Sequence, residues 1–251
     1  MTRQPPDTHG RQTLELLLSP PHACGYLPGL LANTLHVHPA QPMDMGQFEY
    51  LLSTGFRRSG NLVYRPWCSG CAACVPVRIR VSGFETSRAQ RRVIRRNRDL
   101  TIHTGGPDFS DEHFELYRRY LNSRHGDGPM AEPDYDEFTD FLHSDWCAVR
   151  FVDFRLQGRL LQTAVIDQLS NALSAVYTFF DPEESRRSLG TLAVLWEVEM
   201  ARQMELSWIY LGYWIADSAK MCYKTRFQPL EAYINRRWIP LPETEPEAKP
   251  E

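Results

Sequence analysis

Three apolar runs follow one another in the middle of the chain: WCAVRFVDF (146–154), LLQTAVIDQL (160–169) and ALSAVYTFF (172–180). Each has the length and the β-branched and aromatic content that are typical of a strand. The breaks between them contain Gly158 and the pair Ser170-Asn171, which favour tight turns. Because tight turns join antiparallel neighbours, this stretch predicts a three-stranded antiparallel meander.

Elements on both sides of the meander extend it to a domain. Before it, we expect a strand at 100–103 and helices at 111–123 and 133–143. After it, the pattern predicts a long helix, a strand, a short helix and a last strand, at 189–204, 208–211, 217–223 and 230–235. The order β-α-α-β-β-β-α-β-α-β is similar to that of the GCN5-related acyltransferase fold. We therefore predict an α+β protein with a mixed sheet, in which residues 100–240 form an acyltransferase-like domain.

The first 99 residues are interpreted as a smaller, basic region that contains most of the cysteines. We expect strands at 13–18, 61–64 and 77–81, and a helix that begins after Asp44 as N-cap and stops at Gly55. The stretch 241–251 is rich in Pro and Glu and is predicted to be a disordered tail.

Composition narrows the class of protein. The 251 residues are 42% hydrophobic and 24% charged, which is typical of a globular chain and excludes a disordered one. The sequence contains neither an apolar run of about 18 residues nor a secretory signal at the N-terminus. We therefore expect a cytoplasmic protein.

Charge is distributed unevenly along the chain. The formal net charge is −3, but residues 57–98 contain eleven arginines and a single acid, Glu85, so that segment carries 11 − 1 = +10. Within it, 87–98 is predicted to be a helix with Ala89, Val93, Ile94 and Asn97 as a narrow buried stripe. A local basic surface favours a phosphate-rich partner such as RNA, and a solvated arginine-rich helix is the alternative.

The cysteines are clustered as well. Cys68, Cys71 and Cys74 are spaced by three residues, and Cys24 lies upstream. Such spacing allows thiolates to converge on one zinc ion or iron–sulfur cluster, so we predict that these four residues line one site. A cluster of free thiols is the alternative. His36 and His38 are placed in a loop as weaker candidate ligands, whereas Cys147 and Cys222 are interpreted as small buried apolar residues.

Several motifs resemble the arginyl-tRNA–protein transferase family. In the first half they are CGYLPG (24–29), GFRRSG (55–60), YRPWCSGCAACVPVR (64–78) and QRR (90–92). In the second half, YLGYWI (210–215) and MCYKTRFQP (221–229) resemble that family's end pattern. The short N-terminal region is most similar to the bacterial aspartate/glutamate leucyltransferase branch. Unlike the eukaryotic pattern, the chain has Leu27 in place of a second early cysteine and has separated Cys71 and Cys74.

The resemblance implies an enzyme that transfers an amino acid from aminoacyl-tRNA to the N-terminal amine of a protein. For the bacterial branch, this means leucine from Leu-tRNA, acceptors that start with Asp or Glu, and a product marked for degradation through an N-degron. The ester is already activated, so positioning supplies much of the acceleration and no cofactor is required for the chemistry.

Candidate site residues follow from the needs of this reaction. A guanidinium suits the acidic acceptor, and the substrate-binding candidates are Tyr26, Arg65, Arg78, Arg80 and Tyr223. The tRNA backbone would be bound by Arg88, Arg91, Arg92, Arg95 and Arg96. The catalytic candidates are Tyr213, Asp217 and Lys224. An apolar donor pocket would be built from Trp208, Tyr210, Tyr213 and Trp214. The alternatives are core packing for Tyr223 and these aromatic residues, and helix capping for Asp217.

Three other functions remain open at this point. Arginyl transfer to the same acceptors would use the same surfaces. An acetyl-CoA-dependent N-acetyltransferase is indicated by RSLGT (187–191), which partly matches a phosphate-binding turn before a long helix. A non-catalytic RNA-binding zinc module would need only the cysteines and the basic helix, and it would leave the second half without a role.

Overall fold

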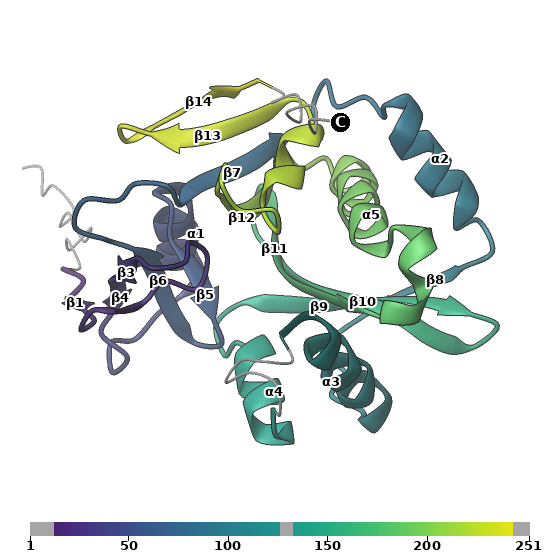
Figure 1. Cartoon of the computed structure of the whole chain (residues 1–251), viewed down its shortest axis with the longest axis horizontal. Coiled ribbons are helices and arrows are strands. Elements are labelled where there is room, and N and C mark those ends of the chain that lie inside the picture. Colours follow the sequence, from purple (N-terminus) through teal and green to yellow (C-terminus); the bar gives the residue numbers. More distant parts are fainter. Residues whose placement is uncertain (1–12, 126–132, 243–251) are drawn as a thin grey trace, which may run out of the picture.

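The computed structural model describes residues 13–125 and 133–242, and an eight-stranded mixed sheet lies at its centre (Figure 1). Across the sheet the strands are β14 (Arg237–Leu241), β13 (Leu230–Ile234), β7 (Val75–Arg80), β12 (Trp208–Trp214), β11 (Ala172–Phe180), β10 (Arg159–Gln168), β9 (Ala148–Leu156) and β8 (Thr101–Gly105). The predicted meander is confirmed, since β9, β10 and β11 pair antiparallel in sequence order. An α+β protein with a mixed sheet is therefore confirmed.

Helices cover both faces of this sheet. One face packs against α5 (Leu189–Gln203), together with α2 (Arg88–Arg96), and the other packs against α3 (Asp111–His125) and α4 (Tyr135–Leu142) (Figure 1). The strands β9 to β11 are mostly apolar because both faces of this part of the sheet are covered by helices. Among residues 13–125 and 133–242, none of the helices has the length and hydropathy that a bilayer span requires.

The N-terminal region forms a second, four-stranded sheet in the order β1 (Leu16–Leu18), β4 (Thr34–Val37), β6 (Leu62–Pro66) and β5 (Arg57–Ser59). A two-stranded ribbon, β2 (His22–Ala23) with β3 (Leu31–Ala32), and helix α1 (Met45–Ser53) complete it. Asp44 is confirmed as the N-cap of α1, where its side chain accepts from the backbone N–H of Gln47. Strand β7 leaves this region and lies between β12 and β13 in the large sheet. The domain boundary predicted at residue 99 stays a prediction.

Several expected elements are wrong in detail. The short helix expected at 217–223 is a 3₁₀ helix, η2 (Cys222–Arg226), which begins after Met221, so Asp217 does not cap it. His36 lies in β4 rather than in a loop, and Cys222 is exposed rather than buried. Another 3₁₀ helix, η1 (Pro182–Arg187), was not expected. Of the tail predicted at 241–251, Leu241 is instead the last residue of β14, and residues 243–251 lie outside the described residues.

Candidate functional site

The two middle strands of the large sheet separate after a short paired stretch. β11 and β12 pair in parallel at only three positions, which end at Ser174 and Tyr210. Although β11 is a central strand, residues 175–178 are partly exposed. Solvent therefore reaches the middle of the sheet where the strands diverge. We call this place, formed by residues 174–180 of β11 and 212–214 of β12, the fork.

A buried arginine from the N-terminal region binds the β11 side of the fork. Arg57 of β5 is 9% exposed and donates to Ser174 Oγ at 3.0 Å and to the backbone oxygen of Ala175. Its guanidinium also lies against Gly212 on β12, where an added Cβ would be 3.4 Å from Nε. Gly212 has φ +76°, a conformation that suits glycine. Burial lowers the pKa of Arg57.

A buried lysine binds the β12 side. The Nζ of Lys224, in η2, donates to the backbone oxygen of Tyr213, and the residue is 6% exposed. Burial, and then the charge of Arg57, lower the pKa of Lys224 to about 7. Each diverging strand thus has a carbonyl that accepts from a buried cationic side chain. Lys224 exchanges protons near neutral pH, as a general acid or base requires.

Two further titratable side chains adjoin these cations. Glu197 of α5 is 1% exposed, and burial raises its pKa to about 8, while Arg57 opposes the shift. Tyr223 precedes Lys224, and burial and then the charge of Glu197 raise its pKa to about 12. Tyr223 also packs against the core that contains α5, so it is both a core residue and a neighbour of Glu197.

All four predicted cysteines line one pocket beside the fork. The pocket has a volume of about 100 Å³, and its lining contains Cys24, Cys68, Cys71 and Cys74 together with Tyr26, Tyr64 and Tyr213. The hydroxyl of Tyr213 donates to the backbone oxygen of Gly55 at 3.0 Å. Because Tyr213 belongs to β12 and also lines the pocket, it connects the cysteine pocket to the fork.

The thiols of this pocket influence one another. Burial, and then the charges of the other three cysteines, raise the pKa of Cys74 to about 11, so its thiol is neutral at pH 7. Within residues 13–125 and 133–242, no three His, Cys, Asp or Glu side chains are placed as a group that could hold a metal ion. The thiols of the pocket are thus not gathered around one point as placed, and no step below uses a metal.

Ligation of zinc or an iron–sulfur cluster therefore stays a prediction of the sequence. Its measurement is elemental analysis, with an absorption spectrum, of protein purified without oxygen. The prediction expects about one zinc ion or one cluster per chain. Protein that is active yet free of zinc and iron would contradict it.

The three arginines predicted to recognise the acceptor do not line the cysteine pocket. Arg65 donates to the backbone oxygen of Thr54 and lies over the Trp67 ring at 4.6 Å. Arg78 donates twice to Glu231, at 3.0 and 2.8 Å, and stacks on aromatic rings that include Trp208. Arg80, at the end of β7, is exposed. Arg65 and Arg78 thus have different partners within the chain, and the role predicted for the trio stays a prediction.

The other predicted residues also have clear places. Asp217 is exposed in the turn before η2. Tyr210 packs between Arg78 and Trp238, on the side of the N-terminal core. Trp214 lies at the end of β12, and its indole Nε1 is buried without a hydrogen-bond partner among the described residues. The predicted aromatic donor pocket is thus divided between different cores.

The basic helix is present as expected. Ser87 caps α2, and five arginines along it are exposed: Arg88, Arg91, Arg92, Arg95 and Arg96. The predicted buried stripe is only partly correct. Asn97 is buried as predicted, whereas Ala89 and Ile94 are exposed. Gln90, which was not predicted, is buried. The side-chain amide of Gln90 donates to the backbone oxygen of Arg226, the last residue of η2, and so is buried between the two helices.

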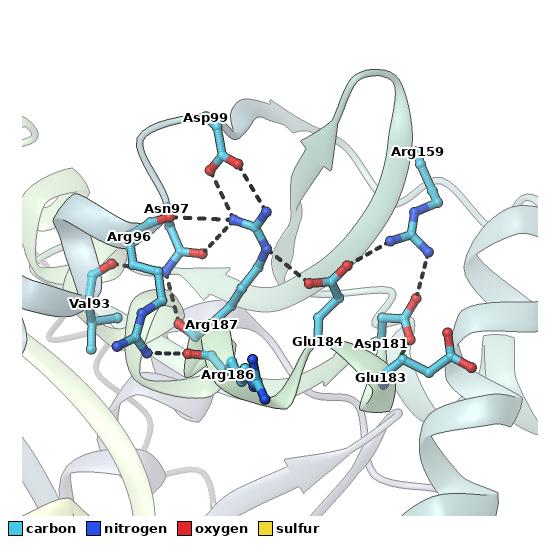
Figure 2. Close-up of polar contacts among 10 residues, drawn as sticks. All are labelled: Val93, Arg96, Asn97, Asp99, Arg159, Asp181, Glu183, Glu184, Arg186 and Arg187. Atoms are coloured by element: carbon cyan, nitrogen blue, oxygen red, sulfur yellow. Dashed lines mark hydrogen bonds and ion pairs between the residues drawn. The ribbon is translucent and has the colours of Figure 1, made fainter.

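The end of α2 is fixed to η1 by a polar network (Figure 2). Asn97 donates to the backbone oxygen of Arg187 at 2.9 Å, and Arg96 donates to that of Arg186. Arg187 in turn pairs with Asp99 through two hydrogen bonds of 2.9 Å and with Glu184 at 3.0 Å. The C-terminal end of α2 is therefore held against η1, the segment before α5.

Sequence reasoning missed Arg57 and Glu197. Arg57 lies within GFRRSG (55–60), a stretch used only for the family resemblance. Glu197 is an acid on the inward face of an apolar helix. A charged residue in such a position is the signal that indicates a buried ionisable group.

Comparisons with known proteins find the same family in both halves of the sequence. The family models described as arginine-tRNA-protein transferase, N terminus and C terminus, match residues 22–92 and 112–234. The chain is 50% identical over 228 residues to an aspartate/glutamate leucyltransferase of Pseudomonas fluorescens Pf-5, covering 91% of this chain and 97% of that one. The same values hold for the aspartate/glutamate leucyltransferase of Pseudomonas putida F1.

Similarity to solved structures is weaker. FemX has a TM-score of 0.45 and 11% identity, covering 69% of this chain and 61% of that chain. L-PGS from Bacillus licheniformis has a TM-score of 0.44 and 11% identity, covering 68% of this chain and 50% of that chain.

Proposed function

The chain belongs to the arginine-tRNA-protein transferase family, and we propose that it is an aspartate/glutamate leucyltransferase that moves leucine from Leu-tRNA to proteins starting with Asp or Glu. The observation that carries this proposal is the 50% identity over 97% of a leucyltransferase's length. Its product would be marked for degradation, and the reaction would take place in the cytoplasm, where aminoacyl-tRNA is made. We also propose that the second half has a GCN5-related architecture, which the order of its elements supports.

The reaction forms an amide bond at the expense of an ester bond. The neutral α-amine of the acceptor attacks the leucyl carbonyl carbon, the new C–N bond forms, and the C–O bond to the tRNA ribose breaks. The amine loses a proton and the ribose oxygen gains one, so the step is balanced. An α-amino group with a pKa of about 7.7 to 8 is partly neutral at cellular pH.

We assign the reacting ester to the fork, with Lys224 and Tyr213 beside it. Lys224, whose pKa is about 7, would receive the proton of the attacking amine. Tyr213 holds the wall between the fork and the cysteine pocket through its hydrogen bond to Gly55. Asp217 is exposed in a turn, so we give it no step in this scheme.

The acceptor would enter through the cysteine pocket. Tyr26 and Tyr64 line this pocket, and the charge of Arg57 lowers the pKa of both, against the larger effect of burial. The positive potential of Arg57 therefore reaches into the cysteine pocket. A potential of this sign favours Asp or Glu over Lys or Arg at the acceptor's N-terminus. Acceptor recognition by Arg65, Arg78 and Arg80 stays a prediction of the sequence.

The tRNA would bind along α2, through Arg88, Arg91, Arg92, Arg95 and Arg96. We expect that changing Arg91, Arg92 and Arg95 together to Gln flattens the slope of log affinity against log salt by about two to three, because each phosphate contact releases about one counterion. Binding of Leu-tRNA is measured by filter retention between low and physiological salt. The matched control is a triple change of Arg118, Arg202 and Arg236, exposed arginines outside α2, to Gln. An unchanged slope in the α2 variant would show that Arg91, Arg92 and Arg95 are solvated and do not contact the tRNA.

The proposed function is tested by a transfer assay. Labelled Leu-tRNA, Arg-tRNA and acetyl-CoA are each offered with peptides that start with Asp, Glu, Lys or Arg. We expect label from Leu-tRNA only, on the Asp and Glu peptides. Preferred use of Arg-tRNA would contradict the leucyl assignment, and preferred use of acetyl-CoA would contradict the aminoacyl-tRNA donor.

A further inference from the structure

Glu197 is a buried carboxyl that the scheme above does not use. It lies in the middle of α5, is 1% exposed, and its Oε2 atom has no hydrogen-bond partner among the described residues. A buried polar atom without a partner destabilises the fold. An apolar side chain at the same position would avoid this cost, so the carboxyl group requires another explanation.

Its surroundings connect it to the fork. Arg57, which binds the β11 side, lowers the pKa of Glu197, and Glu197 raises that of Tyr223. Neither residue donates to the Oε2 atom of Glu197, and the guanidinium of Arg57 instead donates to Ser174 and Ala175. Glu197 is therefore within electrostatic range of the fork and still has a free acceptor atom.

The face of α5 that carries Glu197 is directed at β11. Gly190 lies two helical turns before Glu197 on the same face. A Cβ at Gly190 would be 3.5 Å from the ring of Phe180, the last residue of β11. The same face includes the buried residues Val194 and Ala201. The face of α5 that covers the diverging end of β11 thus consists of small and apolar residues, with Glu197 as the one acid in its middle.

The donor brings a charge that this surface suits. An aminoacyl ester has an ammonium group on the carbon next to the reacting carbonyl, and this ammonium enters wherever the carbonyl enters. A buried ammonium requires an anionic or hydrogen-bonding partner. The cations of the fork, Arg57 and Lys224, would repel it, and Glu197 is the neighbouring acid with an unoccupied oxygen.

We propose that the carboxylate of Glu197 binds the α-ammonium group of the aminoacyl donor and so places the ester carbonyl at the fork. This inference rests on the proposed leucyl transfer and adds a subsite for the backbone of the donated residue. It also gives the enzyme a selectivity: donors whose α-amino group is acylated, such as peptidyl-tRNA, lack the charge that Glu197 requires.

The protonation of the free enzyme is consistent with this role. With a pKa of about 8 in the presence of Arg57, Glu197 is mostly neutral at pH 7 before the donor binds, which makes its burial tolerable. The groups that face it through their charge are Arg57 and Tyr223. An arriving ammonium favours the carboxylate form, so the ion pair forms only when the donor is bound.

The test compares two donors in the wild type and in Glu197→Gln. Leu-tRNA is deaminated with nitrous acid to give the α-hydroxy ester, which has the same side chain and ester but no ammonium. We expect the wild type to prefer Leu-tRNA by about 10- to 100-fold in kcat/KM, as a charged hydrogen bond supplies. In Glu197→Gln this preference should fall to about threefold or less, with kcat/KM for the α-hydroxy donor unchanged.

Controls separate this result from a loss of structure. Glu197→Asp retains the charge and should keep part of the preference, and thermal melting checks that each variant is folded. An equal loss with both donors, or an unchanged preference in Glu197→Gln, would overturn the inference. If the wild type used neither donor, the proposed leucyl transfer itself would fall, and the inference with it.

Discussion

Arg58→Met is expected to destabilise the fold by about 3 to 5 kcal/mol, the cost of leaving a buried charge without its partner. Arg58 donates to both carboxylate oxygens of Asp167, at 2.8 and 2.5 Å, and the two side chains are 1% and 0% exposed. Arg58 also donates to the backbone oxygens of Leu142 and His143. One side chain thus joins β5, β10 and the end of α4. Urea unfolding followed by circular dichroism measures the change.

The control for this prediction is Arg98→Met, which removes an exposed arginine and should change the free energy of unfolding by less than about 0.5 kcal/mol. A double variant, Arg58→Met with Asp167→Leu, should recover much of the lost stability because no unpaired charge remains buried. A loss below about 1 kcal/mol in Arg58→Met would show that Asp167 finds other partners.

Lys224→Met is expected to lower kcat for leucyl transfer by about 10²- to 10⁴-fold, the usual contribution of a positioned general base. The pKa of Lys224 is about 7, so the wild-type rate should rise as the pH increases through 7, as the amine becomes neutral. In the variant this rise should be lost, and only the titration of the acceptor's α-amine, near 7.7 to 8, should remain. Initial rates between pH 5.5 and 9 measure both effects.

Lys220→Met is the matched control, because Lys220 is an exposed lysine just before the same 3₁₀ helix. It should transfer leucine at the wild-type rate. A Lys224→Met variant that is folded, has a normal rate and retains the wild-type pH profile would remove Lys224 from the reaction.

The meander could be predicted from the sequence because its signal is local. The strands of 148–180 lie between helices on both faces, so most of their residues are apolar, and the turns that join them are short. The strand β14 was missed for the opposite reason. It lies at the edge of the sheet and contains Pro240, which is tolerated only at an edge and reads as a loop in a sequence.

The site was less predictable because its contacts join distant parts of the chain. The hydrogen bond from Arg57 to Ser174 spans 117 positions, and no periodicity or spacing reports such a pair. Lys224 was found through a family motif rather than through its burial. Arg78 was assigned to the acceptor because it lies near the cysteines in sequence, whereas β7 directs it to Glu231 and Trp208. Proximity along a chain does not decide on which side of a sheet a residue lies.

The position of β7 between β12 and β13 has a consequence for synthesis on the ribosome. β7 ends at residue 80, but its neighbour β12 begins only at residue 208. At about 5 to 20 residues per second, β7 waits for roughly 6 to 26 s with both of its edges unpaired. An unpaired apolar strand is a site for aggregation or for chaperone binding during that interval. The two halves of this enzyme therefore complete the large sheet together, once residues 208–234 have been synthesised.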